Sequence, residues 1–354
     1  MPLPFLTRRA PWFSMLVHFR DKSDMYRVGG TEFLRRYSLD DADYERKLCS
    51  FPPVVASELT FGMDTAICGE LVMIMREAPM LIGPNARTDV MDAVDLCVQR
   101  GTRVIGLGGL TSPATGGGAL VAERVPAGVT VTNGNAYTAA VVRSNVVDVV
   151  EELDLGRRPV VGVVGCTGSV GSAASWLIGA AGYDMILVGR SVQRVQERLP
   201  GLASEHRCVD SVSALSDADV VVLLTNNPEA QLLPSHVRSG AVVLDVTEPV
   251  TIEREAMAEF QAHGVTVLKG GRARIPNFRS STDLGSDVPP PNSYACFAET
   301  YLFAREGIRE HSVGLPTQAQ AEEMERVAKR HGVHPRPLEL ERIQATREAV
   351  AGGA

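Results

Sequence analysis

The chain has 354 residues, 45% of them hydrophobic and 22% charged, with a formal net charge of −7. This length favours two domains of roughly 150 residues each. The negative charge argues against a nucleic-acid-binding surface, and few aromatic residues are present for base stacking. The six cysteines stand singly, without CxxC or finger-like Cys/His spacing, so we expect no bound metal and a reducing compartment.

The N-terminus contains Arg8-Arg9 followed by a short apolar run, Ala10–Phe19, which has the outline of a secretion signal. Pro11, Ser14 and His18 interrupt this run, and no small-residue cleavage pattern follows it. No stretch reaches the ~18 apolar residues of a membrane span. We therefore expect a cytoplasmic protein without stable membrane insertion.

Residues 1–155 are predicted to form an N-terminal α/β domain that binds the substrate. Helical spacing marks segments near Gly29–Tyr37 and Asp89–Arg100, while Ala66–Met75 is typical of a strand or a buried apolar segment. The elements predicted next are a strand at Arg103–Leu107, a Gly- and Thr-rich loop at Thr111–Gly118, a strand at Val129–Thr132 and a helix at Tyr137–Leu153.

Residues 156–288 are predicted to form a Rossmann-type domain. Its predicted strands are Val160–Val164, Met185–Val188, Asp219–Leu224, Ala241–Val246 and Val265–Leu268, with helices at Ser169–Ala181 and Gln193–Leu199. Near-continuous Val and Leu runs separated by helices indicate a doubly wound parallel sheet covered on both faces.

Residues 289–354 are predicted to be a C-terminal helical segment. Helices are expected at Ser293–His311 and Ala319–His331, and the Gly-Gly-Ala ending suggests that residues 341–354 are loosely held.

A glycine-rich turn follows the first Rossmann strand and opens the next helix, as in a dinucleotide-binding motif. Its glycines allow a sharp turn close to a pyrophosphate, and the helix N-terminus offers N–H groups to the phosphate oxygens. A tight turn without a ligand is the alternative. The residues expected to contact the cofactor here are Gly165, Thr167, Gly168, Ser169, Val170 and Gly171.

The second Rossmann strand ends in Val188-Gly189-Arg190-Ser191, without the Asp or Glu that usually holds the ribose 2′-hydroxyl of NAD. We expect Arg190, Ser191 and Arg194 to bind a 2′-phosphate instead, which makes NADPH the predicted cofactor. The alternative is that these arginines only face solvent. Because ligands bind outside the carboxyl ends of parallel strands, the cofactor crevice should also include Thr225, Asn226, residues 245–247 and Gly270-Gly271.

Cys296 follows three prolines, Pro289–Pro291, and the helix is predicted to begin at a cap provided by Asn292 or Ser293. A cysteine in the first helical turn is favoured as a thiolate by the helix dipole. A small buried packing residue is the alternative and is the commoner fate of a cysteine. Glu299, on the same helical face, would orient a substrate or shuttle a proton, or would be a solvated surface charge.

Several stretches, in order along the chain, resemble the NADPH-dependent acyl-[acyl-carrier-protein] reductases that make fatty aldehydes. They cover roughly residues 100–340. The matching stretches are Gly106–Ser112 (GLGGLTS), Thr132–Ala139 (TNGNAYTA) with Arg143, Val164–Ala173 (VGCTGSVGSA), Tyr294–Glu299 (YACFAE), and Arg330-His331-Gly332 with Pro335 and Leu338.

The resemblance implies that Cys296 accepts an acyl group from a thioester on acyl carrier protein or coenzyme A, and that NADPH then reduces the enzyme thioester to an aldehyde. It also places Thr111, Ser112 and Asn135 at the substrate. The family has a histidine where this chain has Tyr137. If that histidine transfers a proton, either Tyr137 substitutes for it or the role has moved to another residue. A basic run, Lys269–Arg279, would meet an acidic carrier or a pantetheine phosphate, or be solvated.

Two other functions remain open at the level of sequence. A direct alcohol or hydroxy-acid dehydrogenase of the shikimate-dehydrogenase type would share the order of domains and need no nucleophile, but it usually needs a catalytic Lys/Asp pair. The N-terminal region offers only Lys22 and Lys47, both beside other charges. A redox sensor that binds NADP(H) without turnover is the third possibility. The sequence does not predict the oligomeric state.

Overall fold

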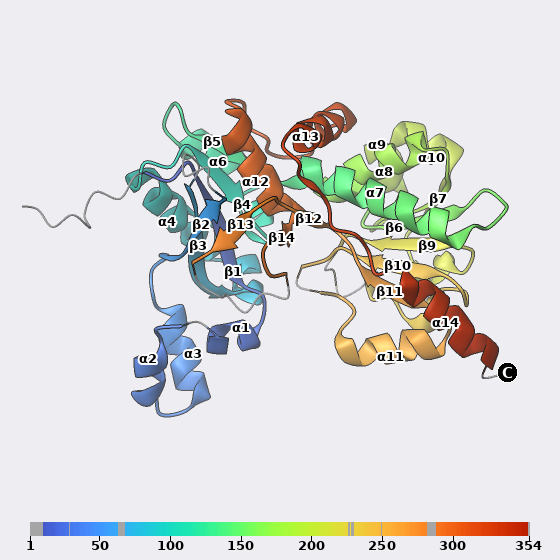
Figure 1. The fold of residues 1–354 in the computed structure, drawn as a ribbon, viewed down its shortest axis with the longest axis horizontal. Coiled ribbons are helices and arrows are strands. Elements are labelled where there is room, and N and C mark those ends of the chain that lie inside the picture. The colour runs from blue at the N-terminus through green and yellow to red at the C-terminus, as the bar shows by residue number, and fades with distance from the viewer. Residues whose placement is uncertain are drawn as a thin grey trace, which may run out of the picture. The chain divides into compact units, whose positions relative to one another are not determined.

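The computed structural model describes residues 10–27, 29–62, 68–225, 227, 230–248, 250–281 and 288–352. They form an α/β fold that divides into two compact units (Figure 1). Unit 1 comprises Met1–Gly134, Arg274–Gly314 and His331–Val333, and unit 2 comprises Asn135–Ala273, Leu315–Arg330 and His334–Ala354. This division differs from the expected three consecutive segments, because the chain returns to unit 1 after the Rossmann strands.

Unit 1 is built on a six-stranded mixed sheet with the order β13-β2-β3-β1-β4-β5. Its strands are β1 (Phe13–Phe19), β2 (Val54–Phe61), β3 (Cys68–Glu77), β4 (Val104–Leu107), β5 (Thr130–Thr132) and β13 (Phe278–Ser280). β3, β1, β4 and β5 run parallel, whereas β2 and β13 pair antiparallel. The apolar run that resembled a secretion signal is therefore β1, a central strand of this sheet.

Two sets of helices cover the sheet of unit 1. α4 (Ala86–Gln99) and α6 (Ala119–Arg124) share a buried apolar cluster with the strands, while α12 (Ala295–Glu306) packs on β1, β4 and β5. α12 approaches β4 closely, since a side chain added at Gly106 of β4 would come within 2.0 Å of Thr300 Oγ1 on α12. The shorter helices are α1 (Lys22–Arg27), α2 (Glu32–Arg36), α3 (Asp41–Cys49) and α5 (Thr111–Ala114).

Unit 2 contains a six-stranded sheet with the order β11-β10-β9-β6-β7-β8. All its strand pairs are parallel, so the predicted doubly wound sheet is confirmed. Its strands are β6 (Val160–Val164), β7 (Asp184–Val188), β8 (Arg207–Val209), β9 (Val220–Leu223), β10 (Val242–Asp245) and β11 (Thr266–Lys269). The chain builds outward from β6 to β8, then returns to β9 beside β6, which makes this junction the topological switch point.

Helices cover both faces of the second sheet. α7 (Asn135–Leu153) and α8 (Ser169–Ala180) pack against each other, and both contact α13 (Gln318–Arg330). Phe260 of α11 (Arg254–Ala262) belongs to the apolar cluster on the other face.

The remaining elements belong to both units. They are α9 (Val192–Arg198), α10 (Pro200–Glu205), α14 (Glu341–Gly352), short strands β12 (Arg272–Arg274), β14 (Asn292–Tyr294) and β15 (His334–Pro335), and 3₁₀ turns at Ala78–Ile82, Val212–Leu215 and Pro234–His236.

The sequence predicts that residues 341–354 are loosely held, but in the structure residues 341–352 form the helix α14. Ile343 is only 2% exposed and belongs to the main apolar cluster of unit 2. The Arg347 guanidinium donates a hydrogen bond of 3.2 Å to the carbonyl of Leu153. These contacts hold the helix to unit 2 despite its glycine-rich ending.

Within the described residues, no helix is both long enough and apolar enough to cross a bilayer. The same residues contain no group of three or more His, Cys, Asp or Glu side chains arranged to hold a metal ion.

Candidate functional sites in the two units

The glycine-rich turn of unit 2 joins β6 to α8 with backbone geometry that only glycine accommodates. Gly165 has φ +86°, and a side chain there would come within 2.9 Å of Thr225 Cβ. A side chain at Gly171 would come within 2.1 Å of the Gly165 carbonyl oxygen. The turn is thus held close to both β9 and α8, leaving its backbone exposed to a ligand at the helix N-terminus.

A cavity of about 200 Å³ opens at the carboxyl ends of β6, β7 and β9. Its lining includes six of the residues predicted to bind the cofactor: Gly165, Thr167, Gly168, Arg190, Arg194 and Thr225. Ser169, Val170 and Gly171 begin α8 beside it. Asn226, also predicted, lies outside the described residues. A concave site with glycines, a helix N-terminus and two cations is chemically suited to a phosphorylated nucleotide.

The cavity's arginines and Ser191 have different structural roles. No described residue forms an ion pair with the guanidinium of Arg190 or Arg194, so both are available to an anion. The Ser191 hydroxyl instead accepts a hydrogen bond of 3.2 Å from the Arg194 backbone N–H and caps α9. Ser191 therefore shapes the loop that carries the arginines.

Asp210, which the sequence did not single out, follows β8 and lines the same cavity. Its carboxylate is acceptor-only when ionised and is suited to a ribose hydroxyl or an amino group. Because Asp210 follows β8, the third strand of unit 2 in chain order, no short motif around the glycine turn includes it. The cavity thus contains both an acid and two arginines, which bears directly on the choice between NADH and NADPH.

At the carboxyl ends of β10 and β11, the buried carboxylate of Asp245 accepts several hydrogen bonds. Its donors are the Thr247 backbone N–H at 3.0 Å, the Thr247 hydroxyl at 2.5 Å and the Lys269 ammonium at 2.7 Å. Arg272, likewise, is 5% exposed and lies 3.3 Å from the Glu248 carboxylate. Two cations of the predicted basic run are therefore paired within unit 2.

Cys296 of unit 1 is half-buried in the first turn of α12. The helix cap is Tyr294 rather than the predicted Asn292 or Ser293, because residues 292–294 form β14. No side chain caps the helix. The predicted position of the cysteine in the first turn is confirmed, and so is its place at the positive end of the helix dipole.

The turn after β5 lies directly against Cys296. Gly134 has φ +72°, and a side chain there would come within 2.3 Å of Cys296 Cβ and 2.4 Å of Cys296 Cα. The neighbouring Asn133 amide donates hydrogen bonds to the carbonyls of Gly117 and Gly314, at 3.0 and 2.9 Å. Two segments of the resemblance, TNGNAYTA and YACFAE, thus meet at this cysteine.

Glu299 is fully buried, so its interpretation as a solvated surface charge is wrong. Its carboxylate accepts a hydrogen bond of 2.5 Å from the hydroxyl of Thr132 on β5. The same Thr132 oxygen accepts a hydrogen bond of 3.0 Å from the Gly134 N–H. The Glu299–Thr132 pair therefore fixes the turn that lies against the cysteine, and a role in orienting substrate or moving a proton stays a prediction.

His18 is a second buried polar residue that the sequence did not single out. It is the penultimate residue of β1, its Nε2 accepts a hydrogen bond of 3.0 Å from the Leu110 N–H, and its Nδ1 lies 2.8 Å from the Phe19 carbonyl. Burial lowers its pKa, with the Phe19 hydrogen bond opposing that shift. A neutral ring with Nδ1 protonated satisfies both contacts and holds the Gly108–Leu110 turn in place.

The predicted substrate residues lie in both units. Thr111 is buried, and its hydroxyl donates to the Gly108 carbonyl at 2.8 Å, so it stabilises the start of α5. Ser112 follows it and is 6% exposed. Asn135 is half-buried and begins α7 in unit 2. Direct contact of any of the three with a substrate remains a prediction.

Tyr137 lies on α7 in unit 2 and is 1% exposed. Burial, with a smaller effect of the Glu325 carboxylate, raises the pKa of its hydroxyl above the usual range. The hydroxyl therefore stays protonated at neutral pH, which is the form a proton donor requires.

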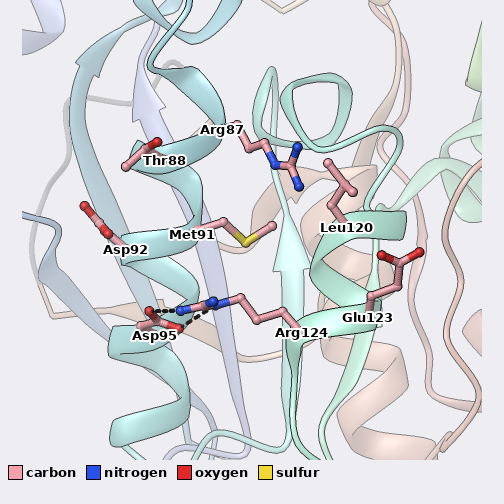
Figure 2. A pocket seen from close by; sticks show the side chains of 8 residues that line it. All are labelled: Arg87, Thr88, Met91, Asp92, Asp95, Leu120, Glu123 and Arg124. Carbon is pink, nitrogen blue, oxygen red and sulfur yellow. Dashed lines mark hydrogen bonds and ion pairs between the residues drawn. The ribbon is translucent and has the colours of Figure 1, made fainter.

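A separate surface depression lies between α4 and α6 of unit 1 (Figure 2). Arg124 reaches across it and forms two hydrogen bonds with Asp95, at 3.0 and 2.5 Å. The other lining residues are Arg87, Thr88, Met91, Asp92, Leu120 and Glu123. We assign this depression no role in the chemistry.

No protein-family model matches the chain. A curated protein, aminotransferase PigE from Serratia sp. (strain ATCC 39006), is 26% identical over 274 residues. The match covers 73% of this chain and 31% of that protein, so the chain spans about a third of the length of its curated relative.

Several solved structures are similar in fold. Shikimate dehydrogenase from Aquifex aeolicus has a TM-score of 0.40 at 11% identity, with 91% of this chain and 100% of that chain covered. Quinate dehydrogenase from Corynebacterium glutamicum, in complex with NAD, has a TM-score of 0.37 at 14% identity, with 96% and 99% covered. L-tryptophan dehydrogenase from Nostoc punctiforme has a TM-score of 0.39 at 10% identity, with 91% and 80% covered.

Proposed function

We propose that this chain is an NADP(H)-dependent oxidoreductase that reduces an acyl thioester to an aldehyde through Cys296. The observation that carries this proposal is the packing of Gly134 against Cys296 in the first turn of α12. A cysteine needed only for packing does not require a positive-φ glycine turn held in place by a buried Thr132–Glu299 pair. The thioester donor is proposed to be an acyl carrier protein or an acyl-coenzyme A.

The proposed chemistry has two steps. In the first, the Cys296 thiolate attacks the acyl carbonyl, the bond from that carbon to the carrier sulfur breaks, and the carrier thiolate leaves and takes up a proton. NADPH, when bound, supplies a hydride to the carbonyl carbon of the enzyme thioester. The bond from that carbon to Cys296 Sγ then breaks, which releases the aldehyde and regenerates the thiolate.

The residues around Cys296 support this scheme physically. A covalent link holds the carbonyl in one place, which removes much of the entropic cost of aligning it for reduction. The first N–H groups of an α-helix have no carbonyl acceptor within the helix, so the start of α12 is suited to stabilise an oxyanion beside Sγ. The glycine turn allows a substrate backbone or chain to approach without a side chain in between.

The choice of NADPH rests on Arg190 and Arg194, which have no acidic partner among the described residues. Two available guanidiniums are suited to a 2′-phosphate. Asp210 offers the competing option, because a carboxylate would favour the unphosphorylated ribose of NADH. We propose that the two arginines determine the preference.

A second candidate is a direct dehydrogenase that oxidises or reduces a hydroxyl and carbonyl pair without a covalent intermediate. The names of the solved structures stand closer to this candidate, but their TM-scores lie below 0.5 and do not distinguish the two. The lysines considered for such chemistry are paired with acids in unit 1, Lys22 with Glu45 and Lys47 with Asp43.

The distinguishing experiment follows NADPH oxidation with a panel of acyl thioesters and, separately, with ketones and aldehydes. We expect oxidation with thioesters, loss of it in Cys296→Ala, and an aldehyde among the products. Full thioester activity in Cys296→Ala would rule out the covalent route. Activity confined to ketones or alcohols, and unchanged in that variant, would establish the dehydrogenase instead. Cofactor binding without any turnover would leave the redox-sensor interpretation.

A further inference from the structure

A buried amide on α7 lacks a hydrogen-bond partner for its donor. Asn145 is 1% exposed, and its Oδ1 accepts a hydrogen bond of 3.1 Å from the Gly271 N–H. That bond fixes the orientation of the amide, because only the oxygen can accept. Its Nδ2 has no hydrogen-bond partner among the described residues.

Such an arrangement is costly unless another molecule completes it. A buried donor without an acceptor loses its hydrogen bonds to water and gains none in the protein. Buried polar groups in native proteins are nearly always paired, so an unpaired one calls for a specific explanation such as a ligand or a bound water. The Nδ2 donor of Asn145 is therefore available to an acceptor from a ligand or a bound water.

The amide lies at the turn after β11, where the backbone carries no side chains. Gly271 has φ +68°, and a side chain there would come within 2.5 Å of Val246 Cγ1, at the end of β10. A side chain at Gly270 would come within 3.3 Å of Asn145 Oδ1. The amide of Asn145 therefore lies against the glycine turn at the carboxyl edge of the sheet, with the Val246 side chain packed on the same turn.

The place in the sheet identifies the kind of ligand. Arg190 and Arg194 lie on the β6–β7–β8 side of the switch point, where the adenosine half of a dinucleotide would bind. The other half would then lie beside the ends of β9, β10 and β11. The charges at these strand ends are paired, Lys269 with Asp245 at 2.7 Å and Arg272 with Glu248 at 3.3 Å, so the local site favours a neutral polar group over an anion.

We propose that Asn145 Nδ2 donates a hydrogen bond to the carboxamide oxygen of the bound nicotinamide. The inference rests on the proposed use of NADP(H) and adds a residue that the glycine-turn motif does not contain. Asn145 binds the nicotinamide half through Nδ2, while its Oδ1 holds the Gly270-Gly271 turn in position.

The test compares two ligands in the full-length protein. One is NADPH, and the other is 2′-phospho-ADP-ribose, which has the adenosine half with its 2′-phosphate and the diphosphate but no nicotinamide. Dissociation constants are measured by calorimetry for wild type, Asn145→Asp, which keeps the acceptor for Gly271, and Asn145→Ala. Asp210→Asn, on the adenosine side, is the matched control for position.

We expect Asn145→Asp to weaken NADPH binding about tenfold, equivalent to about 1.4 kcal/mol, and to change 2′-phospho-ADP-ribose binding by less than about twofold. Asn145→Ala should show the same selective loss. Asp210→Asn should change both ligands alike. Equal weakening of both ligands by the Asn145 variants would show a merely structural role and overturn the inference, as would unchanged NADPH binding. Failure of wild type to bind either ligand would contradict the proposed cofactor itself.

Discussion

The glycine turn against Cys296 gives the sharpest test of unit 1, through the substitution Gly134→Ala. The added methyl group would lie 2.3 Å from Cys296 Cβ and 2.4 Å from Cys296 Cα. Backbone and Cβ atoms cannot rotate away as the end of a flexible side chain can. Either the turn or the first turn of α12 must therefore move.

The size of the effect separates into two parts. A non-glycine residue at φ +72° costs about 1–2 kcal/mol in any surroundings. Crowding in a packed site adds about 1–3 kcal/mol. Gly128→Ala is the matched control, because Gly128 has φ +93° and nothing within 4 Å of the added methyl group. The difference between the two variants isolates the contact with Cys296.

Urea unfolding gives the stability of each variant, and the rate of Cys296 alkylation by iodoacetamide reports on the thiol itself. We expect Gly134→Ala to be less stable than Gly128→Ala by about 1–3 kcal/mol, with an altered alkylation rate at Cys296 only in the former. Equal stabilities and equal alkylation rates would refute the contact. Cys97 and Cys166 serve as internal references, because burial raises the pKa of each thiol to about 12 and keeps both unreactive.

Three further predictions address other parts of the chain. Thr132→Val removes the donor to buried Glu299 and should lower the free energy of unfolding by about 1–3 kcal/mol, whereas Thr130→Val on the same strand should cost less; equal losses in urea titrations would contradict this. Arg190→Ala should weaken NADPH binding about tenfold and leave NADH nearly unaffected by calorimetry, and equal weakening would remove the 2′-phosphate assignment. Because burial lowers the pKa of His18 below 6.5, the unfolded chain takes up that proton first as pH falls. Stability should then decrease below about pH 6.5 by at most about 1.4 kcal/mol per pH unit, and a pH profile unchanged in His18→Gln would contradict this origin.

Much of unit 2 could be predicted from the sequence because its strands are buried on both faces. β6 matches its predicted bounds, and β9 and β10 lie within theirs, since Val and Leu runs of this kind have few alternatives in a parallel sheet. The glycine turn can also be predicted from the sequence, because its glycines form a recognisable motif between a strand and a helix. The role of Asn145 cannot be predicted in this way, because it depends on a hydrogen bond with Gly271, which is 126 residues away.

Unit 1 is harder to predict because its strands pair with segments that are distant in sequence. β1 contains His18 and Ser14 within an apolar run, and its neighbours β3 and β4 follow much later in the chain, so no local pattern marks it as a central strand. α12 was predicted as a helix, but its return to this sheet depends on Thr300 packing over Gly106. Cys296 could be located in a first helical turn, whereas its contact with Gly134 required the structure.

The central claim is that Cys296 carries the acyl group, and intact mass spectrometry tests it most directly. The full-length protein is incubated with an acyl thioester in the absence of NADPH, and then NADPH is added. We predict a mass increase equal to one acyl group, located at Cys296 by peptide mapping, absent in Cys296→Ala and lost when NADPH is added as aldehyde appears. Aldehyde formation with no adduct at any time, and at an equal rate in Cys296→Ala, would contradict the account.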